Sequence, residues 1–151
     1  MKNSLGIAIK QANNALSRDA DHYAKTIGLT GMQITGMQIS IINFIADHEQ
    51  TQNIFQRDLE QEFNIRKATS SSLVTKMVKA DLLVRVPTQH DARYKRLLLT
   101  PKARQLAAQI EQFFQKSEQR MAQLLTTDKT RTYTALSTIS KAFKTPTSIS
   151  K

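Results

Sequence analysis

The chain has 151 residues, of which 40% are hydrophobic, and this is enough to form the core of one domain with extensions. Its 22 Lys and Arg outnumber its 12 Asp and Glu, and the resulting formal charge of +10 favours a polyanionic partner, nucleic acid before an anionic membrane surface. Cysteine is absent, which excludes disulfides, thiolate metal sites and thiol-based redox sensing within the chain.

The first predicted element is a long helix from about residue 5 to residue 27. Its apolar residues recur at intervals of three, four or seven, so they form one stripe along a helix. Polar residues such as Lys2 and Lys10 interrupt its start, which does not fit a signal peptide. No apolar run reaches the ~20 residues of a membrane span, so we expect a cytoplasmic protein with no membrane partner.

A tandem pentapeptide, Thr-Gly-Met-Gln-Ile, occupies residues 30–34 and 35–39. Each copy begins with a Thr that can cap a helix and has a Gln three residues later that can complete a capping box, so two helix starts compete. We favour Thr35, because apolar residues at helical spacing follow it up to the polar stretch at residues 47–53.

Two shorter helices are predicted next, at about residues 55–63 and 67–80. Only Asn64, Ile65 and Arg66 separate them, and a joint of three residues sets two helices at a steep angle. A β-hairpin follows, with β-prone stretches at residues 82–86 and 94–99. The residues between these stretches begin with proline and are mostly polar, which suits a hairpin tip. The hairpin is therefore a wing.

Two more helices complete the predicted order. Thr100 and Pro101 are typical of an N-cap and a first helical residue, and an apolar face continues from there to about residue 126. A last helix starts at Asp128, and the tail from residue 145 is expected to fray. The predicted fold class is mainly α with a small β-hairpin wing: a winged helix-turn-helix with long N- and C-terminal helices.

The outer helices are too long for the small core between them, and their apolar stripes need a partner surface. We infer that the first and last helices of two chains interlock in a homodimer. The chain is then divided into an N-terminal dimerisation helix and linker (1–34), a winged helix-turn-helix DNA-binding domain (35–100) and C-terminal dimerisation helices (101–151).

The helix at residues 67–80 has two different sides. Leu73, Val74, Met77 and Val78 share one side, and small hydrogen-bonding residues and lysines share the other. Small residues near the helix start permit close approach to a DNA major groove, while lysines near its end suit phosphates. An ordinary solvated face is the alternative. The short joint, the basic wing and the net charge together favour DNA.

The wing supplies further candidate contacts. Arg93 at the tip suits the narrow, electronegative minor groove. Asp91 repels phosphate, so we expect it to orient a nearby arginine by a charge-assisted hydrogen bond. A mobile charged turn is the alternative.

The predicted roles follow from side-chain chemistry. Thr69 and Ser72 suit base edges, whereas the basic residues suit phosphates, with guanine as a second option for Arg66. The full set of predicted DNA-binding residues is Arg66, Lys67, Ala68, Thr69, Ser72, Lys76, Asp91, Arg93, Lys95 and Arg96.

An ordered set of motifs runs through residues 34–104: Ile34-Thr35 with Gln38, Ile41-Ile42 and Ile45, then Asp58-Leu59, residues 67–77, residues 82–85, Asp91-Ala-Arg93, and Leu99-Thr100. Together they resemble the MarR (multiple antibiotic resistance regulator) family of bacterial transcription factors. Asp81 and Ala103 stand where the family usually has glycine. Asp tolerates the left-handed conformation and Ala suits a helix, so neither harms the fold. Ser70 replaces an apolar residue, and we expect it to loosen the core.

The resemblance implies a homodimer that binds a pseudo-palindromic operator in double-stranded DNA and regulates transcription, usually as a repressor. It also implies a small anionic or aromatic effector between the dimerisation helices and the DNA-binding domain, often one that releases DNA. We look for the effector site near His22, Lys25 and His48, which the sequence does not rank. The operator, the regulated genes and the effector's identity stay open.

Other functions fit the sequence less well. With four glycines, no phosphate-binding loop and no catalytic Ser, His and Asp set, the chain is not expected to be an enzyme or to hold a cofactor. The run Asp47-His48-Glu49 is interpreted as a solvated helix end rather than a metal site. RNA binding is disfavoured because no Trp and only three Tyr are present to stack on bases. The alternative is a nonspecific polyanion-binding or protein-docking module without operator specificity.

Overall fold

The computed structural model describes residues 3–29, 36–90 and 93–144. The elements in chain order are α1 (Leu5–Thr26), α2 (Gly36–His48), α3 (Gln56–Phe63), α4 (Lys67–Lys79), β1 (Leu83–Pro87), β2 (Lys95–Leu99), α5 (Pro101–Leu125), the short 3-10 helix η1 (Thr126–Asp128) and α6 (Lys129–Ala142). The predicted order and the predicted mainly α fold with a hairpin wing are confirmed.

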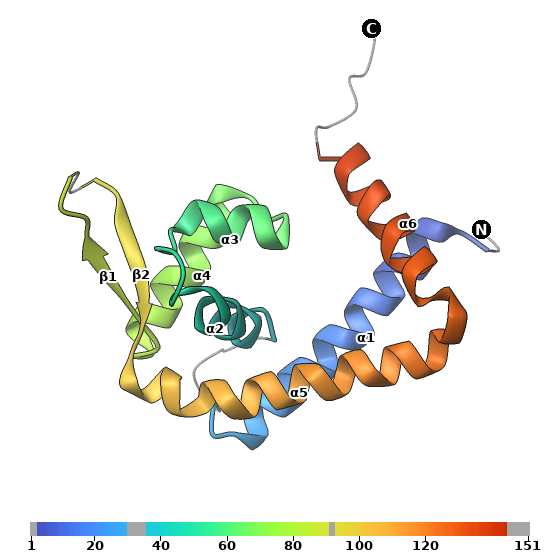
Figure 1. Cartoon of the computed structure of the whole chain (residues 1–151), viewed down its shortest axis with the longest axis horizontal. Coiled ribbons are helices and arrows are strands. Elements are labelled where there is room, and N and C mark those ends of the chain that lie inside the picture. The colour runs from blue at the N-terminus through green and yellow to red at the C-terminus, as the bar shows by residue number, and fades with distance from the viewer. Residues whose placement is uncertain (1–2, 30–35, 91–92, 145–151) are drawn as a thin grey trace, which may run out of the picture.

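The elements form two groups joined by α5 (Figure 1). Helices α2, α3 and α4 and the β-hairpin lie together at one end and α6 lies at the other, while α5 runs along the base of both and α1 extends from its contact with α2 toward the end where α6 lies. The core lies mainly in the first group, where four isoleucines of α2 are fully buried: Ile39, Ile41, Ile42 and Ile45. Burial of this apolar surface is the main force that holds the group together.

Two glycines set the path from α1 into α2. Gly28 has φ +85°, a left-handed conformation that glycine adopts without strain, and it ends α1. Gly36, in the second copy of the pentapeptide, lies so close to α1 that an added Cβ would come within 2.5 Å of the Ala20 Cβ. Its N–H also donates to the Asp21 carboxylate. Helix α2 starts at Gly36, one residue after the favoured Thr35, which lies outside the described residues.

The wing is a two-stranded antiparallel hairpin, in which Arg85 pairs with Leu97 and Pro87 pairs with Lys95. Leu97 is buried, and its N–H donates to the Ile54 carbonyl in the loop after α2, at 2.7 Å. This bond ties the base of the wing to the core.

The turn before the wing and the start of α5 are held by one threonine. Thr100 caps α5 by accepting from the Ala103 N–H at 3.2 Å, and its hydroxyl donates to the Asp81 carbonyl at 2.7 Å. Asp81 has φ 57°, the left-handed conformation expected of it, and Ala103 is fully buried within the helix. The predicted N-cap is confirmed, and both departures from the family pattern fit the backbone.

Helices α1 and α5 pack through an aromatic pair. The rings of Tyr23 and Phe113 stack with centroids 4.3 Å apart, and the Tyr23 hydroxyl donates to the Gln109 carbonyl at 2.9 Å. Burial raises the pKa of Tyr23 above its usual value, so the hydroxyl keeps the proton that this bond needs. None of the described helices has an apolar stretch that could cross a lipid bilayer.

Candidate nucleic-acid interface

Helix α4 packs against the core through the side on which the sequence pattern places its apolar residues. Val74 and Met77 are fully buried, and Leu73 and Val78 are half-buried. A 13-residue helix fixed along one side presents its opposite side as a rigid surface, which is what close docking against another molecule requires.

Ser70 lies on the buried side of α4, and its hydroxyl has hydrogen-bond partners there. Its hydroxyl donates to the Glu60 carboxylate at 2.6 Å and accepts from the Gln56 amide at 3.0 Å. Gln56 also donates to Glu60, at 3.3 Å. A buried hydroxyl with these partners is satisfied, and the bonds join α3 to α4. The expectation of a loosened core weighed lost apolar packing without this partner for the hydroxyl, and the Ser70→Ala substitution tests it.

The outer side of α4 carries the residues that were predicted to meet DNA. Arg66, Lys67, Ala68, Thr69, Ser72 and Lys76 are all exposed. Thr75 is one of the small hydrogen-bonding residues of this helix, and it is half-buried and accepts a hydrogen bond from the Arg85 guanidinium at 3.2 Å. The bond links the end of α4 to β1.

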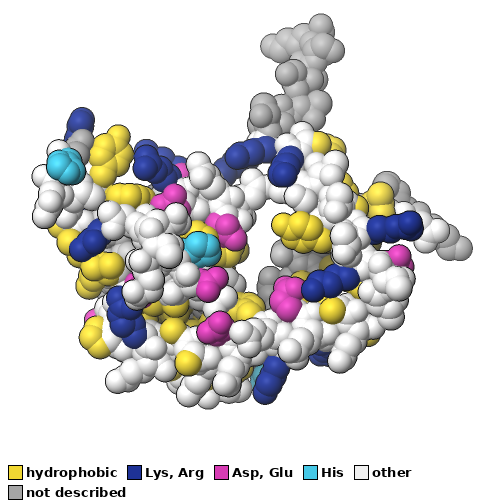
Figure 2. All heavy atoms as spheres, in the orientation of Figure 1, with side chains coloured by type: hydrophobic (Ala, Val, Ile, Leu, Met, Phe, Trp, Pro, Cys, Tyr) yellow, Lys and Arg dark blue, Asp and Glu magenta, His cyan; other side chains and the backbone are white. Residues whose placement is uncertain are grey.

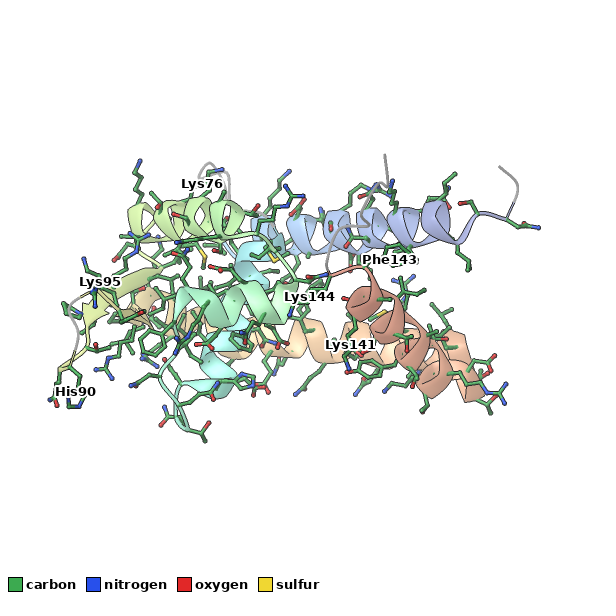
Figure 3. The ribbon with its side chains drawn as sticks, turned by 90° about the horizontal axis from the view of Figure 1, so that it is seen from above. Lys76, His90, Lys95, Lys141, Phe143 and Lys144 are labelled. Atoms are coloured by element: carbon green, nitrogen blue, oxygen red, sulfur yellow. The ribbon has the colours of Figure 1, made fainter. Side chains whose placement is uncertain are left out.

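The structure places the wing residues in different environments. Arg93 and Lys95 are exposed, whereas Arg96 is half-buried and its guanidinium donates to the Asn53 side chain at 3.3 Å. Asp91 lies outside the described residues, so its expected bond to an arginine stays a prediction. Figure 3 shows Lys95 on the wing and Lys76 on α4 toward the same end of the molecule.

A basic cleft of about 420 Å³ separates the wing from the start of α3. Lys67, Arg93 and Lys95, all predicted, line it together with two arginines that the sequence analysis did not select, Arg57 and Arg85. Glu60 is the one carboxylate in the lining, and it already accepts from Ser70 and Gln56. Five cationic side chains around one cleft have the charge that suits a phosphate backbone.

The two arginines are positioned by contacts that only the folded chain shows. Arg57 is in the first turn of α3, and its guanidinium lies 5.3 Å from the centre of the Phe55 ring, a cation–π distance. Arg85 pairs with Leu97 across the hairpin, which turns it toward α4. Arg85 is exposed although it stands two residues after the buried Leu83, so the period-2 alternation of a strand did not point to it; its basic side chain in a predicted wing strand was the signal that the sequence offered.

The geometry suits one kind of ligand. The exposed side of α4 offers small polar residues at its start, and the flanking cleft and wing offer cations. A major groove is about 12 Å wide and admits a helix, while phosphates on either side lie where cations can reach them. The surface is therefore a candidate double-stranded DNA interface of helix plus wing.

The three residues near which an effector site was expected do not lie together in the fold. His22 and Lys25 are exposed on α1, whereas His48 is half-buried in a separate cavity between α2, α3 and α5. Glu49 forms a salt bridge with Arg104 of α5. Across residues 3–29, 36–90 and 93–144, no three His, Asp or Glu side chains are grouped so that they could hold a metal ion.

Comparison with known proteins agrees with this geometry. The model of the MarR family matches residues 30–93. No curated protein matches the sequence. The crystal structure of the transcription regulator MarR from Oenococcus oeni PSU-1 is 30% identical, has a TM-score of 0.75, and aligns over 92% of this chain and 97% of that one.

Two further solved structures share the fold. The S. aureus MepR–DNA complex is 18% identical with a TM-score of 0.76, and the alignment covers 93% of this chain and 98% of MepR. The heme sensor protein PefR from Streptococcus agalactiae, in complex with heme, is 28% identical with a TM-score of 0.58, and the alignment covers 95% of both chains.

Proposed function

Because the chain belongs to the MarR family and has the winged helix fold of its transcription regulators, we propose that it is a homodimeric repressor that binds a pseudo-palindromic operator and responds to a small-molecule effector. The resemblance described from the sequence motifs is thereby confirmed at the level of the family. The repressor role, the operator and the effector are the parts of this proposal that experiments must test.

One observation supports operator binding above the others: the exposed side of α4 and the basic cleft under the wing adjoin each other. Lys67 belongs to both, as the first residue of α4 and as part of the cleft lining. In this arrangement Thr69 and Ser72 contact base edges, and Arg57, Lys76 and Arg85 contact phosphates. Arg93 at the wing enters the neighbouring minor groove.

The outer helices supply the argument for a homodimer. Of the large hydrophobic side chains that are exposed among the described residues, most lie on α1, α5 and α6 or directly after them: Leu5, Ile7, Leu16, Leu124, Tyr133, Leu136 and Phe143. Helix α6 has no buried residue at all. Such helices are stable when a second copy covers their apolar sides, and two-fold pairing of chains sets two α4 helices against two half-sites.

The test is selection of bound duplexes from a random pool at near-physiological salt. A dimer with one α4 per half-site enriches an inverted repeat, with half-site centres about 34–36 Å apart, which is one turn of DNA. Enrichment of a single unrepeated site contradicts the dimeric part of the proposal. If no sequence is enriched and binding to all duplexes is salt-sensitive, the chain is the nonspecific polyanion binder that the sequence left as the alternative.

A further inference from the structure

A cavity of about 300 Å³ lies between α2, α3 and α5, apart from the DNA interface. This is at the lower end of the range for small-molecule pockets, roughly 300–1,000 Å³. Its lining comes from α2 and α3 of the DNA-binding group and from α5. Helix α5 leads from that group to the outer helices (Figure 1).

Aromatic rings from all three helices form the apolar part of the lining. Phe44 comes from α2, Phe63 from α3 and Phe114 from α5, and each is half-buried. The rings of Phe44 and Phe63 meet edge to face, with centroids 5.9 Å apart and an angle of 72° between their planes. Rings at steep angles offer both a face and an edge to a guest molecule.

The charged part of the lining is entirely acidic. Asp47, Glu62 and Glu118 are three of the 12 acidic residues of a chain whose formal net charge is +10, and no Lys or Arg lines the cavity. Within the described part of the chain, none of the three carboxylates forms a salt bridge. Figure 2 shows acidic side chains and a histidine along one side of the central hollow, while Lys and Arg side chains lie on other parts of its rim.

His48 adds a further ring to the lining. Its Nδ1 lies 2.9 Å from the Phe44 carbonyl oxygen, which can only accept, so Nδ1 is the donor of this hydrogen bond. Its ring also stacks at a tilt on Phe44, with centroids 4.4 Å apart.

We propose that this cavity binds an organic cation with an aromatic ring, and that the cation is the effector of the regulator, a second step that rests on the proposed function. Aromatic faces attract cations, and three carboxylates without paired cations attract them further. The same carboxylates repel an anion of equal size. Of the anionic or aromatic effector that the family resemblance implied, this chemistry keeps the aromatic ring and replaces the negative charge by a positive one.

The position of the cavity connects binding to DNA recognition. Phe63 and Glu62 belong to α3, whose hydrogen bonds to Ser70 hold α4, while Phe114 and Glu118 belong to α5. A cation in contact with both helices favours one angle between them. In a dimer this angle sets the separation of the two α4 helices, so the cation changes the affinity for an operator of fixed spacing.

Isothermal titration calorimetry of the full chain without DNA tests the site. Benzyltriethylammonium is the probe, and 4-tert-butylbenzoate is an aromatic anion of similar size. We expect the cation to bind with a millimolar or lower dissociation constant and the anion to bind at least about tenfold more weakly. Equal binding of the cation and the anion overturns the proposed site. Absence of cation binding overturns it too, because a cavity that the second protomer covers is not a binding site in the dimer.

Isosteric variants locate the bound cation. Glu118→Gln and Asp47→Asn each remove one charge at an exposed position of the lining, and each is expected to weaken cation binding about threefold. Glu111→Gln removes a charge from an exposed position of α5 outside the lining and is the control. Equal effects of all three variants would show only long-range attraction and would overturn the assignment.

The effector step is tested separately, with a duplex that the wild-type chain binds. Benzyltriethylammonium at saturation is expected to change the operator dissociation constant about tenfold or more. Tetraethylammonium, a cation without an aromatic ring, is the control, and at the same concentration it should change this constant no more than an equal rise in ionic strength does. Calorimetric binding without this change overturns the effector step alone. A chain that binds the cation but no duplex contradicts the proposed function and leaves the cation site standing.

Discussion

Replacement of Ser70 by alanine tests whether its buried hydroxyl stabilises the α3–α4 pair. The substitution removes the donor to Glu60 at 2.6 Å and the acceptor of the Gln56 amide at 3.0 Å. A hydrogen bond to a charged group contributes about 1.5–3 kcal/mol to stability. Glu60 is half-buried and keeps its bond from Gln56, so the lower end applies.

Alanine also has a higher helix propensity than serine, which offsets this loss by roughly 0.5 kcal/mol. We therefore expect Ser70→Ala to lower the free energy of unfolding by about 1–1.5 kcal/mol. The matched control is Ser71→Ala, the same substitution at the next, exposed position of α4. It should leave stability within about 0.5 kcal/mol of the wild type.

Urea unfolding at one fixed protein concentration measures both variants, because the stability of a dimer depends on concentration. In a Glu60→Gln background the cost of Ser70→Ala should shrink, since the two residues share one interaction. If Ser70→Ala is as stable as the wild type or more stable, the hydroxyl contributes nothing. The expectation from the sequence, that a polar residue loosens this core, would then be right after all.

Four further predictions concern DNA binding and assembly. Lys76→Ala should weaken binding to all duplexes alike and reduce the slope of log K against log salt by about 0.9, as measured by fluorescence anisotropy, and an unchanged slope would remove its phosphate contact. Thr69→Ala should change the preference at one base position by roughly 1–3 kcal/mol in a competition assay; a uniform loss would make it a phosphate contact instead. Arg93→Ala should cost most on sites with A·T-rich flanks, and equal losses on G·C-rich flanks would contradict a minor-groove role. Leu136→Glu, on the exposed side of α6, should lower the mass from that of a dimer toward that of one chain in light scattering, whereas an intact dimer would exclude α6 from the interface.

The sequence predicted the elements well because their determinants are local. Apolar spacing marks α1, α5 and α6, and Thr100 with Pro101 marks the start of α5 to the residue. The left-handed Asp81 was also anticipated, since few residue types other than glycine tolerate this conformation. Each of these features depends on neighbours within one or two helical turns.

What the sequence did not predict depends on contacts between distant residues. The hydrogen bond of Ser70 was missed because its partner Glu60 lies on another helix, and only the angle between α3 and α4 brings them together. Arg57 and Arg85 were missed because the cleft exists only once the wing folds against the start of α3. The acidic cavity joins α2, α3 and α5, so no single periodicity reveals it.

A comparison of operator and scrambled duplexes tests the central claim most directly. The enriched duplex and a scrambled duplex of equal composition are titrated by fluorescence anisotropy at near-physiological salt, and the stoichiometry is measured in the same experiment. We predict a ratio of affinities above about 10³ with two chains bound to each operator. Equal affinities for operator, scrambled duplex and heparin would contradict sequence-specific recognition by α4 and leave only an attraction between a basic protein and polyanions.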